Sequence, residues 1–208
     1  MKEIDIEKWN RKEHFEFFSK MVSPYFGVTT EVNCTKAFQK AKDNSISFFA
    51  YYMHQSIKAV NEIPEFKLRI IDDKVFELDT IHVGTTIGRK DGTFAFTFVN
   101  YSDNFESFNT NLQEEIDAVQ NSSGLRLNGE DRKINLVRYS TLPWVSFSAI
   151  LHPTNLNSKE SVPKITFGKL SERNHEKFLP ISIEAHHGLM DGFHIAQYLE
   201  KFQHFLNS

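Results

Sequence analysis

The spacing of apolar residues changes once near the C-terminal end of the sequence. Across residues 179–185, apolar and polar residues alternate as in a strand with one buried face. From Ile195 to Leu206, apolar residues recur every three or four positions, which indicates an amphipathic helix. The segment between them, residues 186–192, reads His-His-Gly-Leu-Met-Asp-Gly. We expect a short loop between a strand and the last helix, a common location for functional side chains.

The same periodicities predict the elements of the rest of the chain. Helices are expected at residues 10–21, 35–42, 47–61 and 104–120. Extended segments are expected around residues 28–32, in hairpins at 67–78 and 81–99, at 136–151 with a break at Pro143, and in a hairpin formed by 164–169 and 178–184. Helices and antiparallel-looking strands mix without a regular strand–helix–strand repeat. The predicted fold class is therefore an α+β two-layer sandwich, a mixed and largely antiparallel sheet flanked by helices.

Composition limits the classes of function. No repeat or Pro/Gly-rich linker divides the 208 residues, so we expect a single domain over residues 1–208. A net charge of −3 gives no broad basic surface for nucleic acid. The lone Cys34 excludes an intrachain disulfide and a Cys–Cys metal site. No signal peptide or membrane span is visible, so a cytoplasmic setting is expected. The 20 phenylalanines are enough for a core and also for a pocket or subunit interface.

The loop at residues 186–192 admits more than one interpretation. Its histidines and aspartate would form a buried, hydrogen-bonded polar loop if they had no catalytic role. A zinc site using His187 and Asp191 is the weaker hypothesis, since a third ligand and an H-E-x-x-H helix are missing. A general base fits better, because histidine is the residue type whose ordinary pKa lies near neutrality.

Two further segments have distinctive residue patterns. Residues 9–17 follow the pattern W-x-R-x-x-H-F-E-F, and residues 140–147 follow S-x-L-P-W-V-x-F. Alone, the first predicts the start of an amphipathic helix, and the second predicts a strand with a proline turn. Together with H-H-x-x-x-D-G-F-H at residues 186–194, they resemble the chloramphenicol acetyltransferases of the trimeric, histidine-dependent type. The resemblance extends over nearly the whole chain. The HxxxDG element alone would also fit dihydrolipoyl acyltransferase catalytic domains and condensation-type acyltransferases.

The resemblance implies a reaction and its catalytic residues. His187 would be the general base that takes the proton from a primary hydroxyl of the acceptor. The oxygen then attacks the thioester of acetyl-CoA directly, so both substrates must be bound together. Ser140 would stabilise the oxyanion, although a strand-end hydroxyl that bonds its own backbone is the simpler role. Acetyl-CoA is a co-substrate, and the resemblance implies no permanent cofactor and no metal.

The resemblance also implies a supporting structure around the base. Asp191 would pair with Arg11 and hold the loop, rather than orient the histidine as in a Ser-His-Asp triad. Gly192 would allow the backbone to turn. His186 and His194 are expected to be packed or hydrogen-bonded supports.

Substrate-binding roles follow from the same resemblance. Trp144 matches a tryptophan near the coenzyme channel, and Thr166 a threonine near the pantetheine and the reacting carbonyl. An alternative interpretation is that Trp144 and Thr166 are ordinary strand residues without a binding role. Phe94 matches an aromatic wall of the acceptor pocket. The family is a homotrimer with active sites between subunits, the base coming from one subunit and much of the acceptor pocket from its neighbour. The expected partners are acetyl-CoA and a small hydroxylated acceptor, with no nucleic acid and no membrane.

The acceptor pocket departs from the family pattern. Phe18 replaces a tyrosine, Arg138 an asparagine and Leu127 a phenylalanine, while His152 stands at an apolar position. We expect Phe18, Phe94, Arg138 and His152 to be the acceptor-binding residues. The first hypothesis is O-acetylation of chloramphenicol, and the second is acyl transfer to a different hydroxyl or amine. A non-catalytic binding protein with the same fold is disfavoured, because His187, Ser140, Asp191 and Arg11 are all present.

Overall fold

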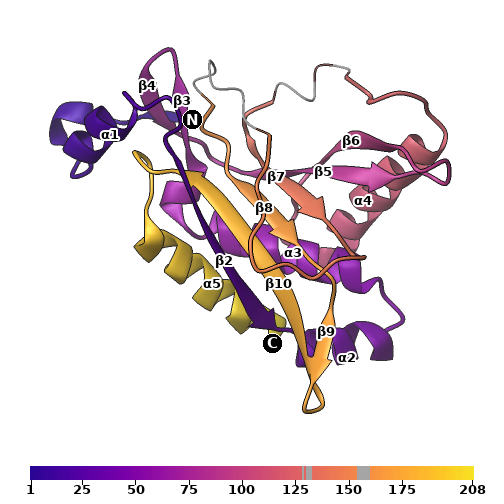
Figure 1. Ribbon diagram of the computed structural model, residues 1–208. Helices are drawn as coiled ribbons and strands as arrows, with labels where there is room; N and C mark the ends of the chain where they lie inside the picture. Colours follow the sequence, from indigo (N-terminus) through magenta and orange to yellow (C-terminus); the bar gives the residue numbers. More distant parts are fainter. Residues whose placement is uncertain (128, 130–132, 154–159) are drawn as a thin grey trace.

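The computed structural model describes residues 1–127, 129, 133–153 and 160–208, and its largest feature is a twisted sheet with helices packed on one face (Figure 1). Within the described residues, the strand order is β2-β10-β8-β7-β5-β6, and β9 also pairs with β10. The strands are β2 (Tyr25–Asn33), β5 (His82–Gly88), β6 (Phe94–Val99), β7 (Leu136–Thr141), β8 (Lys164–Phe167), β9 (Ser171–Arg173) and β10 (Glu176–His186).

Helices supply the second layer. They are α2 (Thr35–Asp43), α3 (Phe48–Asn61), α4 (Phe105–Gln120) and α5 (Gly192–Leu206). A further helix, α1 (Lys12–Phe18), lies apart from this layer near the N-terminus (Figure 1), and two 3-10 turns are η1 (Ile6–Lys8) and η2 (Pro64–Lys67). The Ser47 and Asn104 side chains cap α3 and α4, each by accepting a hydrogen bond from a backbone amide of the first turn. None of the helices among the described residues has the length and apolar character that a membrane span requires.

Apolar and polar residues alternate along β10, which explains why one face of the sheet is apolar and the other is polar. Ile181, Ile183 and Ala185 are buried in the main core, where α3 and α5 also pack. Ser182 and Glu184 point to the opposite face. Hydrogen-bonded register sets Ser182 beside Thr166, and Thr166 beside Ser140, so that a row of hydroxyl side chains crosses this face. The polar chemistry of the sheet therefore lies opposite the helices.

The predicted fold class is confirmed. Strand pairs β2–β10, β10–β8 and β5–β6 are antiparallel, while β5–β7 and β7–β8 are parallel. A smaller sheet, β1 (Lys2–Glu3), β4 (Lys74–Glu77) and β3 (Leu68–Ile71), contains the predicted 67–78 hairpin. Arg69 of β3 is completely buried and donates to the carbonyls of Phe66, Leu68, Ile134 and Leu136.

Two sequence predictions of element length were wrong. The first helix ends at Phe18 instead of residue 21, because the chain turns there through bonds from the Ser19 and Met21 amides. The strand predicted at 136–151 ends at Thr141. Pro143 has no N–H to continue the ladder, and a turn follows in which the Val145 amide bonds Leu142. Trp144, which follows the proline, is 77% exposed.

Candidate active site

The His187 imidazole is held between two aromatic rings just beyond the end of β10. The backbone amide of His187 bonds the carbonyl of Pro24 at 2.8 Å, which extends the pairing with β2 by one residue. The ring stacks on Phe18 with 4.1 Å between ring centroids, and Phe26 lies against it at 4.4 Å. Nδ1 is buried and has no hydrogen-bond partner among the described residues. The orientation of the ring is therefore fixed by packing.

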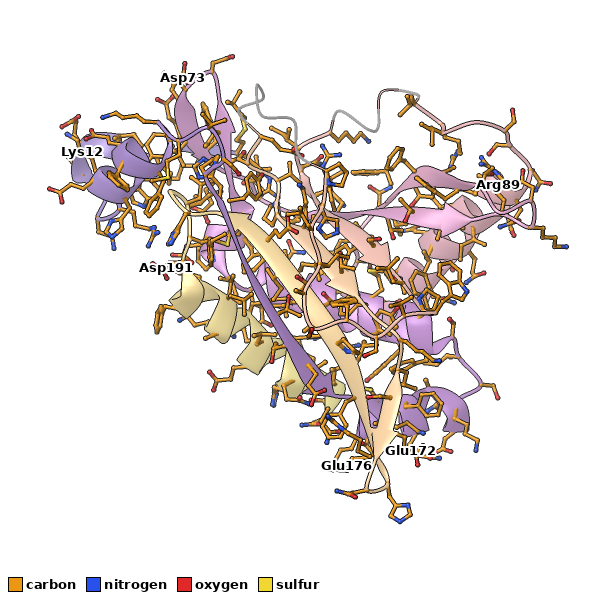
Figure 2. All side chains as sticks on the ribbon, in the orientation of Figure 1. Lys12, Asp73, Arg89, Glu172, Glu176 and Asp191 are labelled. Atoms are coloured by element: carbon orange, nitrogen blue, oxygen red, sulfur yellow. The ribbon has the colours of Figure 1, made fainter. Side chains whose placement is uncertain are left out.

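Arg11 ties this loop to the start of the chain. Its Nη1 donates to Asp191 at 2.6 Å, and its Nη2 donates to the backbone carbonyl of His187 at 3.1 Å. Asp191 lies at the start of α5, where its carboxylate also accepts from the Phe193 amide (Figure 2). Burial raises the pKa of this carboxyl, but the bonds from Arg11 and Phe193 outweigh burial and lower the pKa below its ordinary value. The two ends of residues 187–191 are thus held by one guanidinium.

The other two histidines of the segment have partners inside the protein. His186 is buried, and its Nδ1 accepts a hydrogen bond from the Gly188 amide at 3.1 Å. Burial lowers the pKa of His186 to about 4, so the ring is neutral at physiological pH. His194 Nδ1 accepts from the Asp191 amide at 3.1 Å and completes the cap of α5. Both contacts rigidify the loop.

Gly188, rather than Gly192, is the glycine that the loop requires. Gly192 is not among the glycines with a left-handed backbone, and no described atom lies within 4 Å of the position of an added Cβ. An added Cβ at Gly188 would lie 3.0 Å from the His186 ring and 3.2 Å from the Cα of Phe15. Sequence analysis missed Gly188 because close approach of α1 to this loop is a tertiary contact.

A second group of polar side chains lies on the helix-free face of the sheet. We call Ser140, Thr166, His152 and Glu184 the sheet cluster. Ser140 and Thr166 are neighbours in register on β7 and β8. The Thr166 hydroxyl is fully buried and lies 2.8 Å from His152 Nε2, while His152 Nδ1 lies 2.5 Å from Glu184. Sequence analysis flagged His152 as a departure but gave no role to Glu184.

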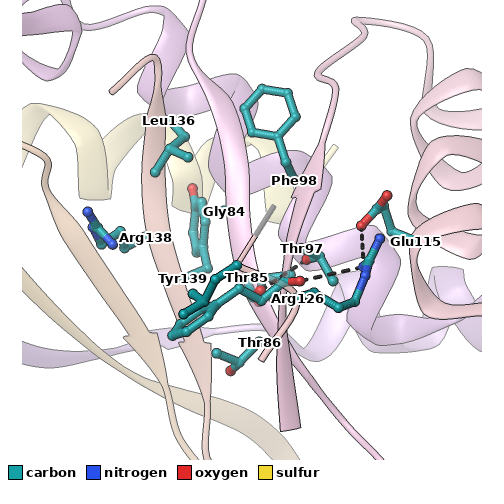
Figure 3. Close-up of a pocket in the computed structure, with 12 residues that line it drawn as sticks. Gly84, Thr85, Thr86, Thr97, Phe98, Glu115, Arg126, Leu136, Arg138 and Tyr139 are labelled. Carbon is teal, nitrogen blue, oxygen red and sulfur yellow. Dashed lines mark hydrogen bonds and ion pairs between the residues drawn. The ribbon is translucent and has the colours of Figure 1, made fainter. Parts of the chain in front are cut away.

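Arg138 lines a cavity of about 570 Å³ beside this cluster (Figure 3). Its guanidinium pairs with Glu160 at 2.9 Å, so it is not an isolated charge facing apolar side chains. A second pair, Arg126 with Glu115 at 2.8 Å, also lines the cavity and was not expected from the sequence. Phe94 is not among the lining residues. It packs edge-on against Phe96, which lines the cavity together with the expected Leu127.

Trp144 borders a separate, mainly apolar groove of about 600 Å³. Its lining includes Phe48 and Tyr52 of α3, Thr141 and Lys169. The Tyr52 hydroxyl lies 3.4 Å from the Thr141 hydroxyl, at the end of the strand that carries Ser140. The groove therefore runs from the exposed indole past α3 to the end of β7, on the helix side of the sheet, a shape that suits a long, flexible substrate arm.

One chain does not bring His187 and Ser140 together. Thr166 is paired with Ser182, and His187 lies five residues further along an extended backbone. At about 3.3 Å a residue, His187 is on the order of 15 Å from Thr166 of the sheet cluster, and Ser140 lies one strand further away. A base must lie within about 3 Å of the proton it removes. The two groups of the same chain therefore cannot act on one substrate atom.

No group of three metal-ligating side chains occurs among the described residues. The two-layer fold, an aromatic-clamped histidine before the last helix and a row of hydroxyls on the sheet are the features that the sequence analysis expected of an acyltransferase.

Comparisons with known proteins identify the family within that class. The family model for chloramphenicol acetyltransferase matches residues 1–203. Chloramphenicol acetyltransferase 3 of Escherichia coli is 27% identical and covers 99% of this chain and 96% of its own length. A solved chloramphenicol acetyltransferase is 34% identical, with a TM-score of 0.91 and 98% of each chain covered. A probable dihydrolipoamide acetyltransferase of Listeria monocytogenes shares only the fold, at 14% identity and a TM-score of 0.68 over 93% of this chain and 88% of its own. The chain belongs to the chloramphenicol acetyltransferase family, a family of acyltransferase enzymes.

Proposed function

We propose that residues 1–208 act as one acetyltransferase domain that transfers the acetyl group of acetyl-CoA to the primary hydroxyl of chloramphenicol and so inactivates the antibiotic. The observation that carries this proposal is the clamp on His187: its ring lies between Phe18 and Phe26, and Arg11 holds its carbonyl. An imidazole held in a fixed orientation is what direct proton transfer requires. The cytoplasm is the proposed location, where a lone cysteine stays reduced.

His187 acts as the general base through Nε2. Nδ1 is the buried ring nitrogen, so Nε2 is the nitrogen left to face a substrate hydroxyl. It takes the hydroxyl proton as the acceptor oxygen bonds to the thioester carbonyl carbon. The proton on the imidazolium then passes to the departing CoA sulfur when the C–S bond breaks. Asp191 and Arg11 hold the loop during this transfer and do not contact the reacting atoms.

The sheet cluster supplies the groups that act on the thioester of acetyl-CoA. The Ser140 hydroxyl donates to the oxygen of the tetrahedral intermediate, where one aimed donor contributes a few kcal/mol. Thr166 lies beside it at the thioester end. The apolar groove next to Trp144 takes the pantetheine arm, which leads the thioester toward Ser140. The cavity at Arg138 takes the acceptor, with the Phe94–Phe96 pair at its rim and with Phe18, which stacks on His187, contributed by the subunit that supplies the base.

We infer a homotrimer with sites between subunits, and the separation of His187 from Ser140 and Thr166 supports a site shared by two copies. A base on the order of 15 Å from Thr166 of its own chain needs the sheet cluster of a second copy. Exposed apolar side chains near the His187 loop and near His152 of the sheet cluster are available for contacts between subunits. They include Phe17, Val22, Leu151 and Phe193. Each active site then takes His187 from one subunit and Ser140 from its neighbour.

An acyltransferase acting on a different hydroxyl or amine is the second candidate function. The ion pairs Arg126–Glu115 and Arg138–Glu160 favour it, because charged groups beside the acceptor cavity suit an acceptor more polar than chloramphenicol.

A thiol-release assay separates the two functions. Acetyl-CoA is incubated with the protein, with and without chloramphenicol, and free CoA thiol is measured. Release that depends on chloramphenicol, together with acetylated drug detected by mass spectrometry, supports the first function. Release only with other hydroxyl or amine acceptors supports the second. No release with any acceptor contradicts both.

A further inference from the structure

Gly84 lies in the middle of β5 and lines the cavity at Arg138. Backbone register places it between Phe98 on β6 and Arg138 on β7, and all three residues line this cavity (Figure 3). Its backbone is not left-handed, so the strand conformation does not require a glycine. A glycine inside a strand weakens the strand, and it often marks a place where a ligand or another backbone approaches closely. The reason for a glycine here therefore lies outside the backbone of β5.

The missing side chain leaves the sheet bare at this point. Buried residues of β5 alternate with Gly84, so position 84 faces away from the core, on the side of the sheet that carries Arg138. An added Cβ would lie 3.0 Å from both terminal methyl groups of Leu136. Leu136 itself lines the cavity. A side chain at position 84 would thus take space from the cavity, directly or by displacing Leu136.

The position of Gly84 relative to Ser140 sets a length for the acceptor. Arg138 and Ser140 are alternate residues of β7, so they face the same side and lie about 7 Å apart along the strand. Gly84 is level with Arg138 on the neighbouring strand, about 5 Å to the side. Gly84 is therefore on the order of 8 Å from Ser140. An acceptor whose hydroxyl reacts beside Ser140 reaches Gly84 only if its body extends that far.

Phe98 and Arg138 stand on the two sides of Gly84. Their strands are the two neighbours of β5, so the backbones that carry them are on the order of 10 Å apart. A phenyl ring and a planar guanidinium both make favourable contacts with flat groups. The space above Gly84 therefore suits a flat group better than a branched one.

We propose that Gly84 is a specificity-determining residue for the acceptor: the end of the acceptor remote from the reacting hydroxyl, a flat aromatic group, lies directly on the β5 backbone at Gly84, between Phe98 and Arg138. The inference rests on the proposed function, in which this cavity takes the acceptor. A side chain at position 84 would fill the space for the aromatic group and leave room only for short acceptors.

A purely structural role for Gly84 makes a different prediction. If glycine is present only because Leu136 fills the space, an added methyl group strains the sheet, lowers the free energy of unfolding and affects both substrates alike. Acceptor binding predicts instead that KM rises for a ring-bearing acceptor and not for acetyl-CoA. The two roles therefore differ in the substrate that is affected.

Two substitutions of increasing size test this difference. Gly84→Ala should raise KM for chloramphenicol, which carries a nitrophenyl ring, about 3- to 10-fold, and Gly84→Val should raise it by more than about 10-fold. KM for acetyl-CoA should change less than about twofold, since the groove at Trp144 has a different lining. The ring-free 2-acetamido-1,3-propanediol should keep its wild-type kcat/KM in both variants. Gly27→Ala on β2, where an added Cβ makes only ordinary contacts, is the matched control and should retain wild-type kinetics. An unchanged KM for chloramphenicol in Gly84→Val, or equal rises for both substrates, would overturn the proposal.

Backbone amide spectra of the wild-type protein test the contact without catalysis. The Gly84 signal is assigned by its loss in Gly84→Ala. Saturating chloramphenicol should shift this signal through the ring current of the bound ring, and should leave the signal of Gly92, in the turn between β5 and β6, in place. An unshifted Gly84 signal overturns the inference. If wild-type protein transfers no acetyl group to chloramphenicol, the proposed function fails instead, and the Gly84 signal still decides whether a ring lies on β5.

Discussion

The Arg11 guanidinium lies 2.6 Å from the Asp191 carboxylate, although the two residues are 180 positions apart in the sequence. The same guanidinium donates to the His187 carbonyl. Arg11 thus fixes both ends of the segment from His187, the proposed base, to Asp191. The Arg11 side chain is 9% exposed and that of Asp191 31%, so the pair is buried on one side and partly hydrated on the other.

Replacing Arg11 tests the importance of this pair. Arg11→Met keeps most of the volume but leaves Asp191 and the His187 carbonyl without their donor. We expect unfolding in urea to become easier by about 1–3 kcal/mol, since partly buried acceptors lose a charged partner. We also expect kcat to fall about 10- to 100-fold, because a small displacement of the base is costly. Asp191→Asn keeps an oxygen to cap α5, so it should lose similar activity but less stability. A wild-type kcat in Arg11→Met would contradict the proposal that Arg11 positions His187 for catalysis.

Removing His187, the proposed base, should have a larger effect on catalysis. His187→Ala should lower kcat by about 10²- to 10⁴-fold, the usual contribution of a positioned general base. Steady-state thiol release measures the loss. Circular dichroism should show an unchanged fold, since the variant removes a half-buried ring outside the main core. His204→Ala is the control at an exposed histidine. Transfer at the wild-type rate in His187→Ala would refute the mechanism.

The fold was largely predictable because most of its elements bury one face. The alternation in β10 and the helical spacing in α5 are local patterns, and both elements occur where predicted. The strand predicted through residue 151 failed because an apolar run such as Trp144-Val145 does not reveal that it will face solvent. The Arg11–Asp191 contact came from family resemblance, since nothing in either segment alone points to the other. The bonds of His152 were unpredictable because they join a loop to two strands.

His186 gives a prediction about stability and pH. Burial lowers its pKa from the ordinary 6.5 to about 4 in the folded protein. Between pH 6.5 and pH 4, His186 therefore binds a proton in the unfolded chain but stays neutral in the folded protein. The free energy of unfolding is therefore highest above pH 6.5, where His186 is neutral in both states. It decreases as the pH falls from 6.5 toward 4, by up to about 3 kcal/mol. Urea unfolding at pH 7 and pH 5 should show a smaller drop for His186→Gln than for wild type. Equal drops would mean that the ring is protonated without cost.

A buried hydroxyl group between two tyrosines gives a prediction about the core. Ser56 Oγ lies 2.9 Å from the Tyr139 hydroxyl and 2.7 Å from that of Tyr198, and all three side chains are buried. Ser56→Ala leaves two buried phenols short of a partner and should cost about 1–3 kcal/mol in urea unfolding. Ser107→Ala, at an exposed position on α4, should stay within about 0.5 kcal/mol of wild type. Equal stabilities of the two variants would show that the phenols find other partners.

Mixing two inactive variants tests whether each active site spans two subunits. His187→Ala loses the base and Ser140→Ala the oxyanion donor, so each homotrimer should be nearly inactive. In the proposed homotrimer, co-expressed chains would form hybrids in which some sites combine the intact His187 of one chain with the intact Ser140 of its neighbour. With equal amounts and random assembly, about a quarter of the sites are complete and about a quarter of wild-type activity should return. Separately purified variants mixed without subunit exchange are the control and should stay inactive. Because one chain holds the two groups on the order of 15 Å apart, no recovery in verified hybrids would require a closure within the subunit that this structure does not contain.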